Sequence, residues 1–318
     1  MSATPPAARR SDRTAVVVLT WNAADTIADC LRSLQSEVRA GDVVVVADNG
    51  SGDGTVAAVR ALALPCVELV EHGENLGFAA GNNRAIEPLL ARGFEFVFVL
   101  NPDTVVERGA LAALRAAAAD APSAGVLQPL LLDAADPARA DSLGLVPRWT
   151  FGGQDRGRGK RVSDRQQPQP IFGACGAAAF CRADTLAAVG LFDEELFVLA
   201  EDLDLAFRVR LSGREVLLVP AARVRHRRGI SGHRLDGAAA LRRKFWLQRN
   251  TVALALRYWP GIWLWAFWPS LLWRAAQALL LAAADPERRC VPLWRRSWAA
   301  RAALRRAMRA RGLDRWFR

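Results

Sequence analysis

Three carboxylates, Glu201, Asp202 and Asp204, lie close together in the apolar segment ELFVLAEDLDLAFRVR. If residues 198–210 form a helix, the period of 3.6 places Asp202 on the apolar stripe that should face the core. Asp204 then points outward and can form an ion pair with Arg208, four residues later. A carboxylate among apolar side chains has a raised pKa, which suits a general base, whereas acids in a first helical turn can also be purely structural.

Polar residues follow each of four apolar runs that we predict to be strands, at 15–20, 42–48, 66–72 and 94–100. Each polar cluster taken alone is typical of an ordinary turn. Four such clusters at the ends of successive strands are more informative, because parallel sheets bind ligands at the carboxyl ends of their strands. The binding candidates in these clusters are Thr20, Asn22, Asp48, Asn75, Gly77, Asn82 and Asn101.

Helices alternate with these strands in the predicted structure. An amphipathic stretch begins at Ile27, a turn and a helix cover 52–62, and a helix that starts at a glycine covers 77–93. Such alternation indicates βαβ units and a mostly parallel sheet, which is an α/β fold. Later in the chain, FGACGAAAFCR is predicted to be a strand of small residues. In ARVRHRRGISGHR, the alternation places Val224 and His226 on one face.

The aspartates after the second and fourth strands suit different tasks. The first strand is followed neither by a G-x-G-x-x-G loop nor by a Walker loop, so a diphosphate would be held in another way. Asp103 is placed to bind Mg²⁺ or Mn²⁺, because such sites combine one or two carboxylates with substrate phosphates. Asp48 can only accept hydrogen bonds, which favours an N–H edge of uracil, thymine or guanine; its structural alternative is a capped turn.

Six motifs follow one another in the order found in family-2 glycosyltransferases: VVVLTWN, VVVVADNGSGDGT, ENLGFAAGNN, VLNPDT, VGLFDEELFVLAEDLDLAFRVRLSG and RVRHRRGISGH. From about residue 15 to 235 the chain resembles these enzymes, and most of all their bacterial rhamnosyltransferase-like branch. The resemblance implies a GT-A nucleotide-diphospho-sugar transferase fold with a Rossmann-like, mostly parallel sheet. It also implies an inverting transfer of a sugar from a nucleotide sugar to an acceptor hydroxyl.

The resemblance implies a role for each candidate residue. Asp48 contacts the base, and the other candidates at the strand ends belong to the nucleotide site. Asp103 binds the metal as the counterpart of the D-x-D aspartate, although this chain has N-P-D where many relatives have D-x-D and so offers fewer acidic ligands. Asp202 is the catalytic base, and His226 completes the metal or diphosphate site.

The sugar pocket is expected near the strand of small residues, where the resemblance places donor and acceptor contacts. Its candidates are Gly173, Ala174, Gly176 and Asp204. Glu201 is a candidate contact to the sugar or the acceptor, with the helix N-terminus as its structural alternative. Arg228 and Arg234 could hold phosphate or could belong to a solvated loop.

The charge of the chain is concentrated near its C-terminal end. The 318 residues carry a net charge of +11, but residues 236–318 hold 17 Lys and Arg against 4 Asp and Glu, which leaves −2 for the rest. Nine of the 11 Trp also lie in this tail, between Trp246 and Trp316. A nucleic-acid-binding protein is disfavoured, because the positive charge is confined to a Trp-rich apolar tail.

Two amphipathic segments of the tail, 242–289 and 292–317, could bind a membrane surface. Pro260, Pro269 and Arg274 interrupt the first, and basic residues flank both of its ends, which argues against a transmembrane span. Interfacial helices use Trp and Arg, so we expect peripheral attachment to the anionic inner face of the plasma membrane. The alternative is a helical subdomain that packs its Trp side chains on the catalytic core.

These patterns predict three segments: a disordered lead over 1–13, a GT-A catalytic domain over 14–235 and a basic amphipathic helical tail over 236–318. The five Cys are scattered, and no apolar stretch follows the basic residues near the start, so we expect a cytoplasmic protein without a disulfide framework.

The expected function is transfer of a sugar, with rhamnose favoured, to a hydroxyl of a glycan or lipid-linked acceptor in cell-envelope polysaccharide synthesis. The favoured donor is dTDP-rhamnose, with UDP- and GDP-sugars as alternatives. The competing function is a catalytically inactive sugar-nucleotide-binding or scaffold protein of the same fold.

Overall fold

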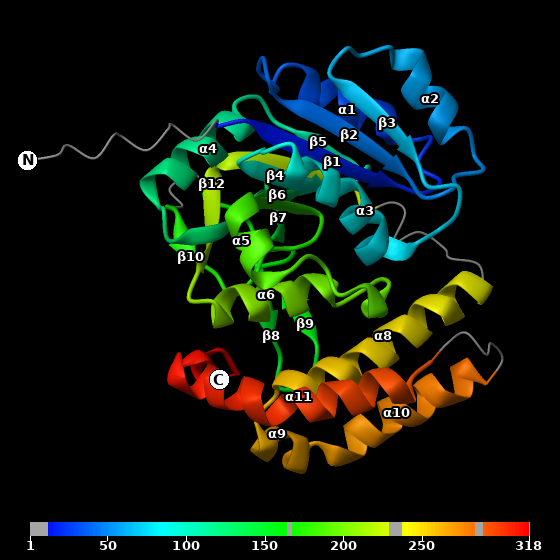
Figure 1. Cartoon of the computed structure of the whole chain (residues 1–318), viewed down its shortest axis with the longest axis vertical. Coiled ribbons are helices and arrows are strands. Elements are labelled where there is room, and N and C mark those ends of the chain that lie inside the picture. Colours follow the sequence, from blue (N-terminus) through cyan, green and yellow to red (C-terminus); the bar gives the residue numbers. More distant parts are fainter. Residues whose placement is uncertain (1–11, 164–166, 229–236, 284–288, 318) are drawn as a thin grey trace, which may run out of the picture.

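The computed structural model describes residues 12–163, 167–228, 237–283 and 289–317. Segments rich in apolar residues form the parallel half of its main sheet: β1 (Thr14–Thr20), β2 (Val43–Asp48), β3 (Val67–Glu71) and β4 (Phe96–Leu100). Their order is β3-β2-β1-β4, so the direction of winding reverses between β1 and β4. The segments after these strands therefore meet at one edge of the sheet, as the sequence predicted (Figure 1).

The other half of the sheet is mixed. It contains β5 (Thr104–Val106), β6 (Ala124–Asp133), β7 (Ala140–Ser142), β10 (Gln169–Pro170), β11 (Ala178–Arg182) and β12 (Glu215–His226). β11 runs antiparallel to β4 and β6, whereas β6 and β12 are parallel. β8 (Leu145–Pro147) and β9 (Gly153–Asp155) form a separate ribbon. The predicted strand of small residues is regular only over β11, and irregular chain precedes it.

Helices cover both faces of the sheet because alternate strand residues point to opposite sides. One face packs against α1 (Ile27–Gln35), α2 (Thr55–Leu62) and α4 (Ala110–Asp120). The other packs against α3 (Gly77–Ala91), α5 (Ala183–Val189) and α6 (Glu201–Leu211), which the short η1 (Glu194–Leu196) precedes. Val16 and Val18 face the first set of helices, and Val17 faces the second.

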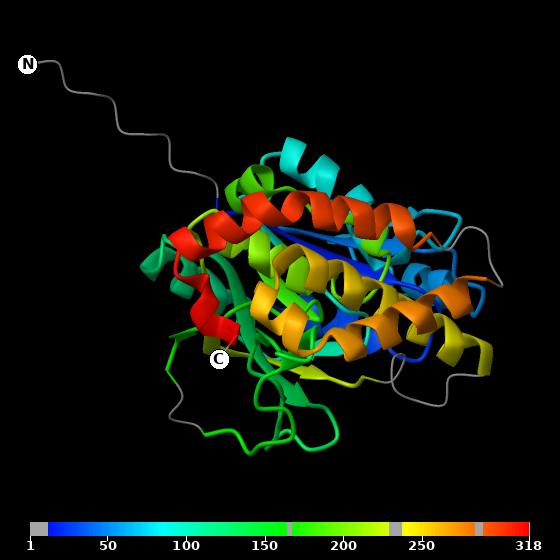
Figure 2. The ribbon, with the colours of Figure 1, turned by 90° about the horizontal axis from the view of Figure 1, so that it is seen from below.

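The tail packs on the outer side of α6. It comprises α8 (Gly237–Tyr258), α9 (Gly261–Ala266), α10 (Trp268–Ala282), α11 (Val291–Ala310) and η2 (Leu313–Phe317). Tyr258 and Trp259 join Phe207 of α6 in one buried cluster. Part of the tail therefore packs on the catalytic core, as the alternative prediction for the tail expected. Figure 1 shows α8 beside α6, and Figure 2 shows α10 and α11 beside α8.

The predicted segment boundaries can be placed only in part. Residues 1–11 of the predicted lead, and the predicted boundary between 235 and 236, lie outside the described residues. Among the residues that are described, no helix combines the length and the apolar character needed to cross a membrane.

Candidate functional site

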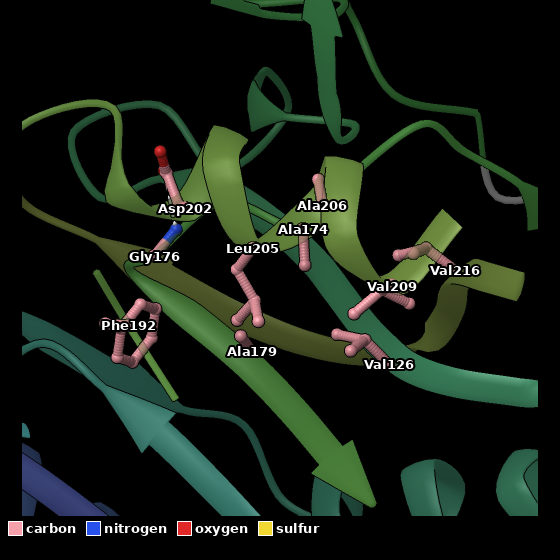
Figure 3. A pocket seen from close by; sticks show the side chains of 10 residues that line it. All are labelled: Val126, Ala174, Gly176, Ala179, Phe192, Asp202, Leu205, Ala206, Val209 and Val216. Carbon is pink, nitrogen blue, oxygen red and sulfur yellow. Dashed lines mark hydrogen bonds between the residues drawn. The ribbon is translucent and has the colours of Figure 1, made fainter. Parts of the chain in front are cut away.

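Asp202 lies on the core-facing stripe of α6, as the sequence predicted. With Leu205, Ala206 and Val209 it lines a narrow apolar pocket between α6 and the sheet. Figure 3 shows Asp202 at one end of this pocket, next to Gly176. The helix itself begins only at Glu201, three residues later than predicted.

Two backbone groups hold the Asp202 carboxylate. The Gly176 N–H donates to Oδ2 at 3.1 Å, and the Leu203 N–H donates to Oδ1 at 2.8 Å. Burial raises the pKa of Asp202 to about 6. The hydrogen bond from Gly176 lowers the pKa and offsets part of this effect, whereas the negative charge of Asp155 raises the pKa further. At neutral pH the group is therefore a carboxylate of raised basicity, which is the form that a general base requires.

His226 connects Asp103 to a carboxylate that the sequence analysis missed. Its Nε2 lies 3.2 Å from Oδ1 of Asp103, and its Nδ1 lies 2.8 Å from Oδ2 of Asp141 on β7. Burial lowers the pKa of His226, but the two carboxylates outweigh it and raise the value to about 9. His226 shares the buried face of β12 with Val224, as the alternation predicted.

Arg228 extends this cluster toward Asp202. The Nε of Arg228 donates to Asp141, and its Nη2 donates to Oδ2 of Asp155 on β9 at 2.6 Å. Asp155 is in turn one cause of the raised pKa of Asp202. A series of contacts therefore runs from Asp103 through His226, Asp141 and Arg228 to Asp155, and the negative charge of Asp155 acts on Asp202. Arg234, the other predicted phosphate contact, lies outside the described residues.

The turns after β1 and β2 close on each other. Asp48 is almost fully buried, and its carboxylate accepts hydrogen bonds from the N–H (2.9 Å) and the hydroxyl (2.5 Å) of Ser51. Asn22 is exposed and accepts from the Gly52 N–H at 2.8 Å. Thr20 is buried beside them. The capped turn that was the structural alternative for Asp48 is therefore present, and a base contact stays a prediction.

The remaining strand-end candidates have local contacts. The exposed Asn75 accepts from the Gly77 N–H at 2.9 Å, and the buried Asn82 donates to the Phe78 carbonyl at 2.8 Å within α3. Gly77 has φ 78°, and a Cβ there would lie 2.6 Å from the ring and carbonyl of Phe197. Gly77 thus allows close packing of the loop before α6, a role that the sequence did not predict. The partly buried Asn101 takes part in the turn after β4.

Two predicted pocket residues have structural roles instead. A side chain at Gly173 would collide with Ala206 of α6, so this glycine permits close packing and does not line the pocket. Asp204 does not point to solvent or into the pocket: it is fully buried, because α8 covers the outer face of α6. Its oxygens lie 2.7 Å from Arg208 Nε and 2.7 Å from Arg257 Nη1. Ala174 and Gly176 line the apolar pocket beside Asp202, and their contact with a sugar stays a prediction.

Glu201 is buried at the start of α6. Burial, followed by the negative charge of Asp202, raises its pKa well above the ordinary value. Its Oε2 has no hydrogen-bond partner among the described residues. Glu201 therefore holds its proton to a higher pH than an ordinary glutamate does.

Asp103 and His226 are the residues best placed to hold a divalent cation. In the part of the chain that the structure describes, no three His, Cys, Asp or Glu side chains form a metal-binding group. The buried Nε2 of His226 lies 3.2 Å from Asp103 Oδ1 without the geometry of a hydrogen bond. Two protein ligands suit a cation that also binds substrate phosphates. A bound cation would displace the proton that Nε2 holds beside Asp103, while Asp141 would keep the other ring nitrogen protonated. The donor set fits.

Known proteins share this sequence and architecture. Residues 15–188 match the sequence model of glycosyl transferase family 2. N-acetylglucosaminyl-diphospho-decaprenol L-rhamnosyltransferase of Mycobacterium tuberculosis is 32% identical over 237 residues, which cover 68% of this chain and 76% of the relative. Galactofuranosyltransferase GlfT1 of the same species is 28% identical over 198 residues, or 62% of this chain and 64% of the relative.

Solved structures confirm the predicted fold. Mannosyltransferase PcManGT from Pyrobaculum calidifontis, in complex with GDP-Man and Mn²⁺, aligns with a TM-score of 0.54 at 22% identity, over 94% of this chain and 86% of that chain. GalNAc-T7 with UDP, GalNAc and Mn²⁺ aligns with a TM-score of 0.59 at 15% identity, over 92% of this chain but 54% of the other. With the GT-A architecture in place and the family match covering more than half of its length, this chain belongs to glycosyl transferase family 2.

Proposed function

We propose that this glycosyltransferase inverts the sugar at C1 as it moves it from a nucleoside-diphosphate donor to an acceptor hydroxyl, with Asp202 as the general base. The observation that carries the proposal is the position of Asp202. Its carboxylate lines an apolar pocket and has a pKa of about 6. The contacts that start at Asp103 and His226 end at Asp155, whose charge contributes to that pKa.

In this reaction the acceptor oxygen attacks C1 while the bond between C1 and the diphosphate oxygen breaks. Asp202 takes the hydroxyl proton, and the electron pair of the broken bond leaves with the nucleoside diphosphate. The N–H groups of Gly176 and Leu203 orient the Asp202 carboxylate. A direct displacement needs no covalent enzyme intermediate, so the site requires no Ser or Cys nucleophile.

The diphosphate end of the donor belongs near Asp103 in this proposal. Asp103 and His226 would hold Mg²⁺ or Mn²⁺, while Asp141 and Arg228 keep the His226 ring in place. When bound, such a cation offsets the negative charge that develops on the leaving diphosphate. The structure neighbours solved with Mn²⁺ support the choice of a divalent cation.

The donor that we favour is dTDP-rhamnose, and the favoured acceptor is a lipid-linked glycan. The support is the relative named as a rhamnosyltransferase of a diphospho-decaprenol substrate. UDP- and GDP-sugars are alternative donors, since two structure neighbours bind UDP and GDP-Man. Such an acceptor would place the enzyme at the membrane, on a path to a cell-envelope polysaccharide.

A donor screen tests the proposed function. The purified protein is incubated with dTDP-, UDP- and GDP-sugars and a polyprenyl-diphosphate-linked acceptor, with Mg²⁺, with Mn²⁺ or with EDTA. We expect transfer from dTDP-rhamnose with inversion. Chelation should abolish it, because without a cation the carboxylate of Asp103 would repel the leaving diphosphate. Nucleotide binding without turnover of any donor would favour the inactive sugar-nucleotide-binding alternative.

We also propose that the tail attaches the enzyme to the inner face of the plasma membrane. The apolar face of α9 and α10 is exposed, with side chains at 76% for Trp265 and 67% for Trp273. Its other members are Ile262, Trp268, Leu272 and Leu280. Exposed basic residues on the neighbouring helices complement an anionic surface: Arg242, Arg243, Lys244, Arg295, Arg306 and Arg309. Trp and Arg in this arrangement are typical of interfacial helices.

Co-sedimentation with vesicles that contain anionic lipid tests the attachment. Replacing Trp265 and Trp273 together with Ser is expected to weaken binding by at least about tenfold, because burial of one such side chain contributes about 1.5–3 kcal/mol. High salt should weaken the wild type further through its Lys and Arg residues. The control is Trp21→Ser, which removes an exposed Trp on the catalytic half. Wild-type binding by the double variant would exclude this face.

A further inference from the structure

The segment that leads into α6 has an unusual backbone. Phe197 (φ 59°, ψ −67°), Leu199 (φ 72°) and Ala200 (φ 77°, ψ 0°) all have positive φ although none is glycine. Such conformations are unfavourable for L-residues and persist only where the surrounding structure holds them. Because Glu201 and Asp202 follow directly, whatever holds this segment also sets the direction of the first turn of α6.

Asn250 of α8 holds the segment from the tail side. Its Nδ2 lies 2.7 Å from the carbonyl oxygen of Leu196, 3.0 Å from that of Val198 and 2.8 Å from that of Leu199. Two N–H bonds are thus shared among three carbonyls. The Asn250 Oδ1 accepts from Nη1 of Arg249 at 2.9 Å, and the side chain is fully buried.

Contacts on both sides complete the clamp. Arg249 Nη1 donates to the Glu195 carbonyl at 2.6 Å, and Trp246 stacks on Phe197 with ring centroids 4.6 Å apart. From α3, the Ala79 N–H donates to the Phe197 carbonyl at 3.1 Å. The segment before Asp202 is therefore held between α3 and α8, the first helix of the tail.

We propose that Asn250 is a positioning residue for sugar transfer, which fixes Asp202 against Gly176 by holding the carbonyls of Leu196, Val198 and Leu199. The inference rests on the proposed role of Asp202 as the base. A neutral amide is suited to this task, because it supplies two donors for the carbonyls and one acceptor for Arg249. The tail thereby becomes part of the catalytic apparatus without touching the reacting atoms.

Asn250→Ala tests the inference through a separation of kinetic constants. We expect kcat to fall about 10²-fold, the order of loss that a displacement of about 1 Å causes in a catalytic group. The Kd for the nucleoside diphosphate should change far less than kcat, because Asn250 bonds to Leu196, Val198 and Leu199 and to none of the candidate nucleotide residues. The pH midpoint of kcat/KM should fall below that of the wild type, because a displaced Asp202 leaves its apolar pocket for water.

A second variant and a matched control make the result decisive. Asn250→Asp keeps the size of the side chain and the contact with Arg249, lacks the donors, and should show the same loss of kcat. Leu254→Ala, one turn further along α8 in the buried cluster with Phe207, should lower the Tm but retain the wild-type kcat and pH midpoint.

Wild-type kcat and pH midpoint in both Asn250 variants would overturn the inference. So would an equal kinetic change in Leu254→Ala, or failure of both Asn250 variants to fold, since Asn250 would then support the fold as a whole. The proposed function fails in a different way: the wild type would transfer no sugar, or Asp202→Asn would remain active.

Discussion

Replacement of Asp202 by Asn is expected to lower kcat about 10²–10⁴-fold, the range that a positioned general base contributes. The amide has nearly the size of the carboxylate and can keep the contact between Gly176 N–H and its oxygen, but it cannot accept the acceptor proton. Nucleotide affinity should change little, because the proposed diphosphate site is at Asp103 and His226. Steady-state kinetics and nucleotide titration measure the two quantities separately.

The control for this prediction is Asp136→Asn, the same chemical change in an exposed ion pair with Arg139. It should leave both quantities at the wild-type level. The pH profile of the wild type is a second readout of the same group. Because only the carboxylate form accepts a proton, kcat/KM should rise with pH through a midpoint near 6 and fall off below it. Full activity of Asp202→Asn would remove Asp202 from the mechanism.

The positions of the first four strands and the apolar face of α6 could be predicted from the sequence because short-range patterns determine both. Apolar runs gave β1 to β4 within two residues of their ends, and the period of 3.6 placed Asp202 with Leu205 and Val209 on the pocket side of α6. Such patterns reflect which face of an element is buried, and that face is encoded locally.

Asp141 and Asp155 could not be found in the same way. They belong to β7 and β9, each three residues long, and so short a strand has no periodicity that marks a functional position. Only the pairing of β7 with β6, and the contacts of Arg228, bring these carboxylates to His226 and Asp202.

The start of α6 and the direction of Asp204 were predicted wrongly for a related reason. Leu199 and Ala200 have positive φ without any glycine to signal it, so the apolar pattern extended the predicted helix too far. Asp204 was predicted to face solvent because a helix period identifies a face but not the element that covers it. That element is α8, whose Arg257 lies 53 positions away in the sequence.

Asp204 is expected to have the largest effect on stability of the carboxylates in this segment. The two carboxylate oxygens of Asp204 accept hydrogen bonds of 2.7 Å from Arg208, Arg257 and the Tyr258 hydroxyl. The side chain is fully buried. Asp204→Asn leaves two guanidinium groups without their shared carboxylate, and removal of one partner from a buried ion pair costs about 3–5 kcal/mol. For a chain of this length, that corresponds to a fall in Tm of about 4–8 °C.

Glu201→Gln is the matched control, because the two buried acids of the same helical turn should respond in opposite ways. Because its pKa is raised in the folded protein, Glu201 holds its proton to a higher pH there than in the unfolded chain, which releases it at about pH 4.3. The free energy of unfolding therefore falls as the pH rises past about 4.3. Glutamine has no proton to release, so the variant does not lose this part of the free energy of unfolding. At pH 7 its Tm should equal or exceed that of the wild type. Calorimetry of both variants at pH 7 measures the difference. Equal losses would mean that burial alone, and not the bridge from α6 to α8, sets the stability of this turn.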